Sequence, residues 1–101
     1  MLSYTVAVTF ANQTQVDAWL HWLREGHIAD VMAGGAAAAE IVQMDTPALT
    51  YEVRYRFPSR DAFAAYERDF APRLRAEGLR LFPTDQGISY RRSVGMIVGK
   101  F

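Results

Sequence analysis

Apolar and polar residues alternate along two stretches of the chain, and a period of two predicts half-buried β-strands. In residues 2–10 the apolar side consists of Leu2, Tyr4, Val6, Val8 and Phe10. In residues 49–57 it consists of Leu49, Tyr51, Val53, Tyr55 and Phe57. Each of these strands therefore has one face that must be covered by another layer of the protein.

The segment after the first strand has apolar residues at helical spacing. They are Val16, Trp19, Leu20 and Leu23, with His27 on the same face. Either Asn12 or Thr14 can cap this helix, because both side chains accept hydrogen bonds from free backbone amides. Gly26 ends or kinks the helix, residues 27–32 can add a turn or two, and Gly34-Gly35 stops it.

A second helix is predicted after residues 49–57. Ser59 is its expected N-cap. Phe63, Tyr66, Phe70 and Leu74 then recur at helical spacing. Pro72 either kinks this helix or starts a new turn after Phe70, because proline has no amide hydrogen to donate. Gly78 is the expected residue just beyond the last turn.

Two further strands, 37–45 and 88–98, complete the pattern. Residues 45–48 form a short hairpin connection, which requires antiparallel pairing and excludes a simple parallel α/β sheet. The order is then strand, helix, strand, strand, helix, strand. We therefore expect an α+β fold of the ferredoxin-like βαββαβ type, with a four-stranded antiparallel sheet and two helices on one face. The chain, residues 1–101, is expected to form one such domain.

The sheet face away from the helices is predicted to be polar. It carries Thr5, Thr9, Glu52, Arg54 and Arg56, with Ser89, Arg91 and Ser93 from the last strand. Either solvent covers this face, or the sheet of a second copy packs on it and encloses a partly polar cavity. The apolar stretch from Val94 to Phe101 favours a homodimer, because a small domain rarely leaves such a strand bare. Arg92 falls on the apolar side, which requires a bulge or an edge strand.

Composition narrows the classes of function. Lys plus Arg is 11 and Asp plus Glu is 11, so the chain lacks the basic excess of a nucleic-acid-binding module. Cysteine is absent, which excludes thiol nucleophiles and zinc–thiolate sites. No apolar run approaches the roughly 20 residues that span a bilayer, and the N-terminus lacks the basic region of a signal peptide. We expect a cytoplasmic protein with no membrane or nucleic-acid partner.

Two residues are candidates for acid–base catalysis. The ordinary pKa of a histidine suits proton transfer near neutral pH, and His27 lies where the first helix breaks. Asp30 follows closely and could orient the imidazole. The structural alternative is that His27 stabilises the helix dipole or packs against Trp19 or Leu23.

A second set of residues is a candidate for ligand binding. Arg54, Arg56 and Arg91 can contact a carboxylate or a phosphate through a planar guanidinium, and Glu52 and Tyr55 complete the set. No cofactor is expected. His21 and His27 point in different directions on a helix, and Gly34-Gly35 lacks the lysine and serine of a phosphate loop.

Several stretches together resemble a known family. One set is residues 1–6, the helix 19–23 leading into Glu25-Gly26-His27-Ile28, and residues 31–35; the other is residues 51–55 and 66–75. Over nearly the whole chain they resemble the bacterial domain-of-unknown-function family four-two-eight-six. The family usually has proline after His-Ile, where this chain has Ala29.

The resemblance implies a dimeric α+β barrel, similar to antibiotic-biosynthesis monooxygenases, in which two sheets meet face to face. Relatives in that superfamily include cofactor-free monooxygenases, haem-degrading enzymes, lactone isomerases and stress-induced proteins. The implied function is binding of a small anionic or aromatic molecule beside the sheet, with cofactor-independent oxygenase- or isomerase-like chemistry. The alternative is a non-catalytic dimerisation, structural or stress-related module, because a shared fold does not transfer activity.

Overall fold

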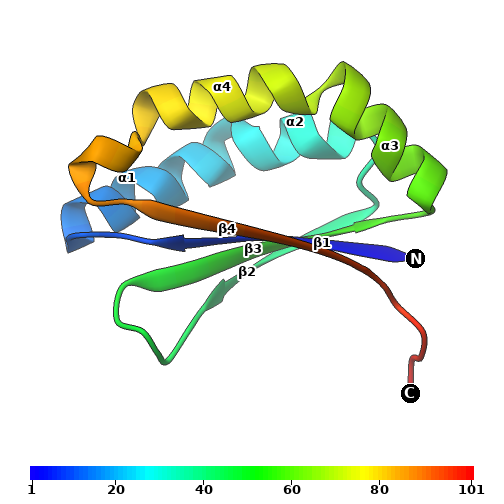
Figure 1. Ribbon diagram of the computed structural model, residues 1–101, viewed down its shortest axis with the longest axis horizontal. Coiled ribbons are helices and arrows are strands. Elements are labelled where there is room, and N and C mark those ends of the chain that lie inside the picture. Colours follow the sequence, from blue (N-terminus) through cyan, green and yellow to red (C-terminus); the bar gives the residue numbers. More distant parts are fainter.

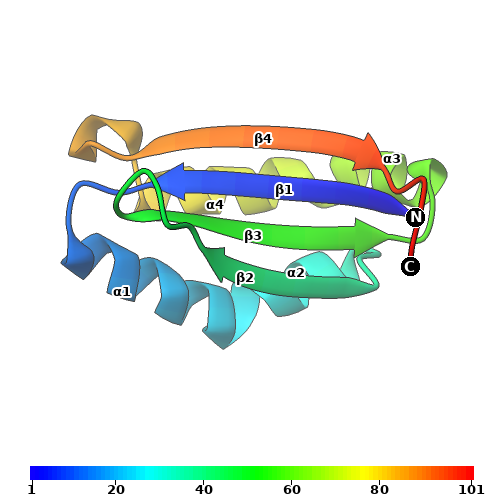
Figure 2. The same cartoon turned by 90° about the horizontal axis from the view of Figure 1, so that it is seen from below.

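The computed structural model describes residues 1–101 and contains one four-stranded antiparallel sheet with all its helices on one face (Figure 1). The elements are β1 (Leu2–Thr9), α1 (Gln13–Trp22), the π-helical turn η1 (Leu23–His27), α2 (Ile28–Ala33), β2 (Ala38–Gln43), β3 (Thr50–Phe57), α3 (Arg60–Asp69), α4 (Ala71–Leu81), the 3₁₀ turn η2 (Thr84–Gln86) and β4 (Ser89–Met96). The strand order is β2-β3-β1-β4 (Figure 2). The predicted ferredoxin-like α+β fold is confirmed.

The register of the sheet explains the position of Arg92. Strand β1 lies between β3 and β4, and Val6 pairs with Val53 on one side and with Arg92 on the other. The pairing of β4 with β1 runs without a bulge from Ser89 to Met96. Arg92 therefore does lie on the helix-facing side of the sheet, and it is tolerated there because β4 is an edge strand that leaves its side chain exposed.

The apolar sides of β1 and β3 pack beneath the helices and form the core. Leu2, Val8, Tyr55 and Phe57 are at most 1% exposed. The helices contribute Val16, Trp19, Leu23, Val31, Phe63, Tyr66 and Leu74. Removal of these large side chains from water is the main force that holds the helical layer on the sheet.

The first helical segment begins at Asn12 and continues past Gly26. The Asn12 side chain accepts a hydrogen bond from the Gln15 amide at 2.9 Å, so Asn12, not Thr14, is the cap. Gly26 has non-helical dihedral angles inside η1, yet the chain resumes as α2. Gly26 therefore kinks the helix. The stop comes at Gly34 and Gly35, and Gly35 has a φ of 124°, a value that suits glycine.

The second helical segment is divided near Pro72 and extends further than predicted. Ser59 caps α3 by accepting a hydrogen bond from the Ala62 amide at 3.1 Å. The break falls at Phe70, and Pro72 lies in the first turn of α4, where its missing amide hydrogen costs little. The prediction that Gly78 follows the helix is wrong, because α4 runs to Leu81. A Cβ atom at Gly78 would lie 3.2 Å from the Trp22 ring, so this glycine permits α4 to approach α1 closely.

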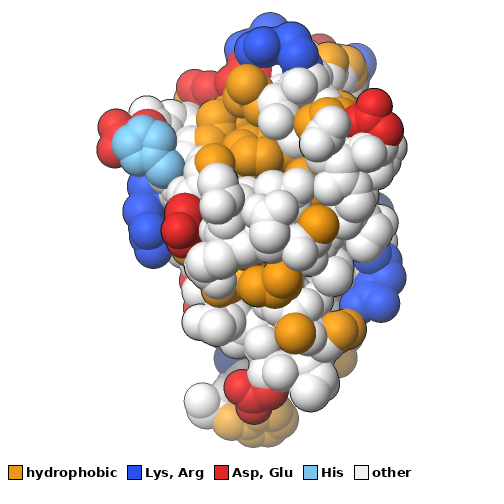
Figure 3. Space-filling model, turned by 90° about the vertical axis from the view of Figure 1, so that its left-hand side faces the viewer, with side chains coloured by type: hydrophobic (Ala, Val, Ile, Leu, Met, Phe, Trp, Pro, Cys, Tyr) orange, Lys and Arg blue, Asp and Glu red, His pale blue; other side chains and the backbone are white.

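No helix covers the opposite face of the sheet (Figure 2), and its side chains include the polar Thr5, Glu52 and Arg54. Arg54 and Glu52 form a salt bridge there with a 2.9 Å N–O distance. On the helix-facing side of β4, at the edge of the sheet, Val94 is 47% and Met96 is 43% exposed, and Val98 beyond the strand is 96% exposed. On the end of the molecule seen in Figure 3, positive and negative side chains are interspersed among hydrophobic patches. No helix is both long enough and apolar enough to cross a membrane.

Candidate functional site

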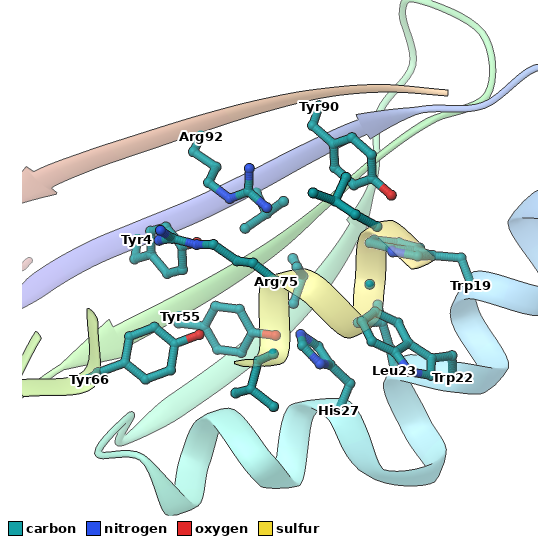
Figure 4. Close-up of a pocket in the computed structure, with 15 residues that line it drawn as sticks. Tyr4, Trp19, Trp22, Leu23, His27, Tyr55, Tyr66, Arg75, Tyr90 and Arg92 are labelled. Atoms are coloured by element: carbon teal, nitrogen blue, oxygen red, sulfur yellow. The ribbon is translucent and has the colours of Figure 1, made fainter. Parts of the chain in front are cut away.

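A pocket lies between the sheet and the helical layer, and its wall contains many aromatic side chains (Figure 4). The space between its lining residues, counted together with open solvent at the mouth, is about 510 Å³. The aromatic residues in its lining are Tyr4, Trp19, Trp22, Tyr55, Tyr66 and Tyr90. They come from two helices, α1 and α3, and from three strands, β1, β3 and β4. A wall of this kind suits a planar, largely apolar molecule.

The nitrogen-bearing groups of the lining, apart from the tryptophan rings, are His27, Arg75 and Arg92, and no Asp or Glu lines the pocket. His27 is the last residue of η1, Arg75 lies on α4 and Arg92 on β4. The fold gathers no group of three or more His, Asp and Glu side chains that could hold a metal ion.

His27 is held by its stack on Trp22, whose ring centroid is 3.9 Å away at an interplanar angle of 21°. Burial lowers the pKa of His27 to about 4, although the Glu77 and Asp30 carboxylates act in the opposite direction. The imidazole is therefore neutral at pH 7. Its Nδ1 atom is buried and has no hydrogen-bond partner.

Tyr55 carries a second buried polar atom without a partner, its hydroxyl oxygen. In Figure 4 this hydroxyl points toward His27. Burial, followed by the neighbouring Tyr66 and Tyr4 side chains, raises the pKa of Tyr55 far above its usual range. Burial likewise raises the pKa of Tyr66 to about 12. Both phenols keep their protons at neutral pH and can donate hydrogen bonds.

The two arginines differ in how they are held. Arg75 donates from Nη2 to Glu67 Oε2 at 2.9 Å and to the Tyr4 hydroxyl at 3.3 Å. Its Nε atom is buried and unpartnered. Burial opposes the charge of Arg75, but its hydrogen bonds to Tyr4 and Glu67 raise its pKa overall. Arg92 is exposed, and its guanidinium carbon lies 5.7 Å from the centre of the Tyr90 ring.

Three side-chain atoms of the protein are both buried and without a hydrogen-bond partner, and all three belong to residues of this pocket. They are His27 Nδ1, the Tyr55 hydroxyl and Arg75 Nε. Such atoms are rare in native proteins, because each has lost its hydrogen bonds to water without replacement. Unused donors and acceptors inside an apolar pocket provide sites for the polar groups of a bound molecule.

The candidates from the sequence fall on both sides of the sheet. His27 and Tyr55 line the pocket. Asp30 is exposed on α2 and does not line the pocket. The remaining four candidates do not line it either: Glu52, Arg54 and Arg56 lie on the open face of β3, and Arg91 lies on the open face of β4.

Sequence reasoning did not find Arg75 or Arg92 as site residues. Arg92 did carry a signal, because it interrupted the apolar side of its strand. Arg75 carried none, because its place in the pocket depends on how α4 packs over the sheet. Arg91 contributes instead to a separate hollow on the open face, beside Thr9 and Thr50.

The fold and the pocket together define a ferredoxin-like α+β protein. The chain belongs to the family described as Domain of unknown function (DUF4286), whose model matches residues 1–94. The comparison with curated proteins found no match.

Solved structures share the fold at low sequence identity. A dimeric ferredoxin-like protein from an uncultured marine organism has a TM-score of 0.76 and 13% identity, and the alignment covers 99% of this chain and 97% of that one. SnoaB, a cofactor-independent oxygenase from Streptomyces nogalater, has a TM-score of 0.66 and 10% identity, with coverage of 98% and 94%. An antibiotic biosynthesis monooxygenase has a TM-score of 0.61 and 16% identity, with coverage of 98% and 100%. At these identities the likeness establishes the fold alone.

Proposed function

We propose that this protein binds a small, planar and largely apolar molecule in the pocket between its helices and its sheet. The observation that carries this proposal is the concentration of unpartnered buried polar atoms at His27, Tyr55 and Arg75 within an aromatic wall. A protein that used these residues only for its core would gain stability by pairing or removing those atoms. A ligand that supplies the missing partners offsets their cost.

Thermal unfolding in the presence of aromatic and saturated probes tests this function. We expect 2-naphthol and indole to raise the unfolding midpoint in a concentration-dependent way, because they bind only the folded state, and decahydro-2-naphthol to raise it less. Val6→Phe places a larger side chain in the pocket and should weaken binding of the aromatic probes by about tenfold or more. Thr5→Val, one residue away on the open face, should bind them as the wild type does.

If none of the probes changes the midpoint, or if Val6→Phe and Thr5→Val bind equally well, the pocket does not bind molecules of this kind. That result would favour the alternative, a non-catalytic dimerisation or structural module.

Cofactor-independent proton transfer is the chemistry that the pocket residues support. His27 is a weak base because its pKa is about 4, so it suits proton abstraction from a strongly activated C–H next to a carbonyl group, while the Tyr55 hydroxyl donates a hydrogen bond to the carbonyl oxygen. The same proton can return to another carbon, which is an isomerisation. The SnoaB name describes a cofactor-independent oxygenase, so catalysis without a cofactor occurs on this fold. Deuterium exchange into 2-tetralone, followed by NMR, should be faster with wild type than with His27→Phe.

The proposal also covers the oligomeric state, which we expect to be a homodimer. The open face of the sheet is the surface that a second copy would cover, and the exposed Val94 and Met96, on the helix side of the edge strand β4, add apolar surface at its margin. Two of the similar structures are described as dimeric ferredoxin-like proteins. Light scattering at micromolar concentration should therefore give about twice the chain mass of 11.4 kDa. A mass equal to one chain would contradict the dimer and leave the pocket proposal standing.

A further inference from the structure

We infer that the molecule bound in this pocket is an organic anion, with its carboxylate or equivalent group held by Arg92 and Arg75 between β4 and α4. This inference rests on the proposed function, because it names the charge of the ligand that the pocket would bind. It also differs from the sequence-based prediction, which assigned anion binding to the arginines of the open face.

Arg92 is a guanidinium without a carboxylate partner on the helix-facing side of the sheet. Its neighbours on that side of β4 are Tyr90 and Val94, and in the adjacent strand it pairs with Val6. The salt bridges of the protein involve Arg54, Arg68 and Arg75, but not Arg92. Its guanidinium lies over the face of the Tyr90 ring. All of its hydrogen-bond donors therefore remain available to a molecule in the pocket.

Arg75 lies opposite on α4, where Glu67 and Tyr4 hold its Nη2 atom and its buried Nε donor is unused. A buried donor on a charged group is costly to leave unpaired. An anionic oxygen is the strongest acceptor that could satisfy it, and a planar carboxylate matches the fork of a guanidinium.

Of these two cations, Arg75 is paired with Glu67, which lies outside the lining, whereas Arg92 has no carboxylate partner. The nearby carboxylates are already engaged outside the lining, since Glu67 accepts from Arg75 and Glu77 accepts from Trp22 Nε1 at 3.2 Å. The chain as a whole has a formal net charge of zero, so the unpaired charge of Arg92 is a local positive excess at the pocket.

The positions of the polar groups also indicate how the ligand is oriented. Leu79 and Arg92 are the exposed residues of the lining, so the mouth lies between α4 and β4. His27 and Tyr55 lie on other elements, η1 and β3, and offer uncharged hydrogen-bonding atoms. The best-fitting class is therefore an aromatic acid whose anionic group lies at the mouth and whose hydroxyl or carbonyl group faces His27 and Tyr55.

Titration calorimetry with matched acid and amide probes tests this inference. We would titrate 6-hydroxy-2-naphthoate and 6-hydroxy-2-naphthamide, which have the same rings and differ in charge, into the full-length protein at pH 7. The acid should bind about tenfold or more tightly than the amide, and added salt should narrow the difference. Arg92→Gln should weaken binding of the acid by a larger factor than binding of the amide, and so reduce this preference. Arg91→Gln, the next residue on the opposite face, should preserve it.

The possible outcomes separate the two proposals. Equal binding of acid and amide to the wild type would overturn the anion assignment and leave the pocket as a binding site for planar molecules. If Arg92→Gln and Arg91→Gln lost equal affinity for the acid, the assignment would also be overturned. The attraction would then come from the arginine charges of the protein in general and not from Arg92. Failure of the naphthols, the acid and the amide alike would contradict the proposed function itself.

Discussion

At the scale of single residues, the buried imidazole of His27 links the stability of the fold to pH. Its pKa is about 4 in the folded protein, against 6.5 as the ordinary value expected in the unfolded chain. As the pH falls, His27 is therefore protonated at a higher pH in the unfolded chain than in the folded protein. The stability that neutral His27 contributes is fully present above about pH 6.5 and is lost as the pH falls from there toward 4.

We expect this one residue to lower the free energy of unfolding by up to about 3 kcal/mol between pH 7 and pH 4. His27→Phe keeps a ring against Trp22 and should remove that part of the pH dependence. His21→Phe, on the exposed side of α1, should retain it. Urea unfolding at several pH values measures the difference, and equal pH profiles for His27→Phe and the wild type would contradict it.

Removal of the hydroxyl group should affect stability differently at two tyrosines. The Tyr90 hydroxyl donates to the Phe82 carbonyl at 2.6 Å, whereas the buried Tyr55 hydroxyl has no partner. Tyr90→Phe should therefore cost about 1 kcal/mol of stability. Tyr55→Phe should cost nothing or stabilise the protein, because it removes an unpaired buried group. A larger loss in Tyr55→Phe than in Tyr90→Phe, measured by chemical denaturation, would argue that the Tyr55 hydroxyl has a structural partner.

At the scale of elements, the start of α1 shows how a local ambiguity is resolved. Asn12 and Thr14 were equally acceptable caps by residue type, and the structure uses Asn12. Asn12→Ala should lower the free energy of unfolding by about 1 kcal/mol, because one amide of the first turn loses its acceptor. Thr14→Ala should change it by less than about 0.5 kcal/mol, since Thr14 is exposed and does not cap the helix. Comparable losses in the two variants would be inconsistent with this cap.

Elements were predictable from the sequence where the cause is local. Alternation located β1 and β3, and Ser59 located the start of α3. Gly78 was wrongly predicted to end the helix, because its role depends on tertiary packing: it leaves room for Trp22 from another helix. The site residues, too, were predictable only where a local feature of the sequence marks them. His27 could be selected by its residue type, whereas Arg75 and Arg92 meet only because α4 packs over the edge of the sheet.

At the scale of the whole molecule, the proposed homodimer makes stability depend on protein concentration. If two sheets meet face to face, the thermal midpoint should rise as the concentration is raised. Thr5→Arg places a charge on the open face, where Thr5 is only partly buried, and should abolish this dependence and halve the mass measured by light scattering. Ala64→Arg, on the exposed side of α3, should keep both properties. A concentration-independent midpoint in the wild type would show that the chain folds as a monomer.

The contact between Trp22 and Gly78 also bears on how quickly the pocket fills and empties. The Trp22 ring lies against Gly78, and its Nε1 donates to Glu77, so α1 and α4 are joined on that side of the pocket. A ligand then exchanges past the side chains of Leu79 and Arg92, whose rotations take nanoseconds or less, without separation of the helices. We therefore expect stopped-flow fluorescence of Trp22 and Trp19 to report a single phase whose rate grows in proportion to ligand concentration. Differences in affinity between ligands would then arise chiefly from how long each one stays.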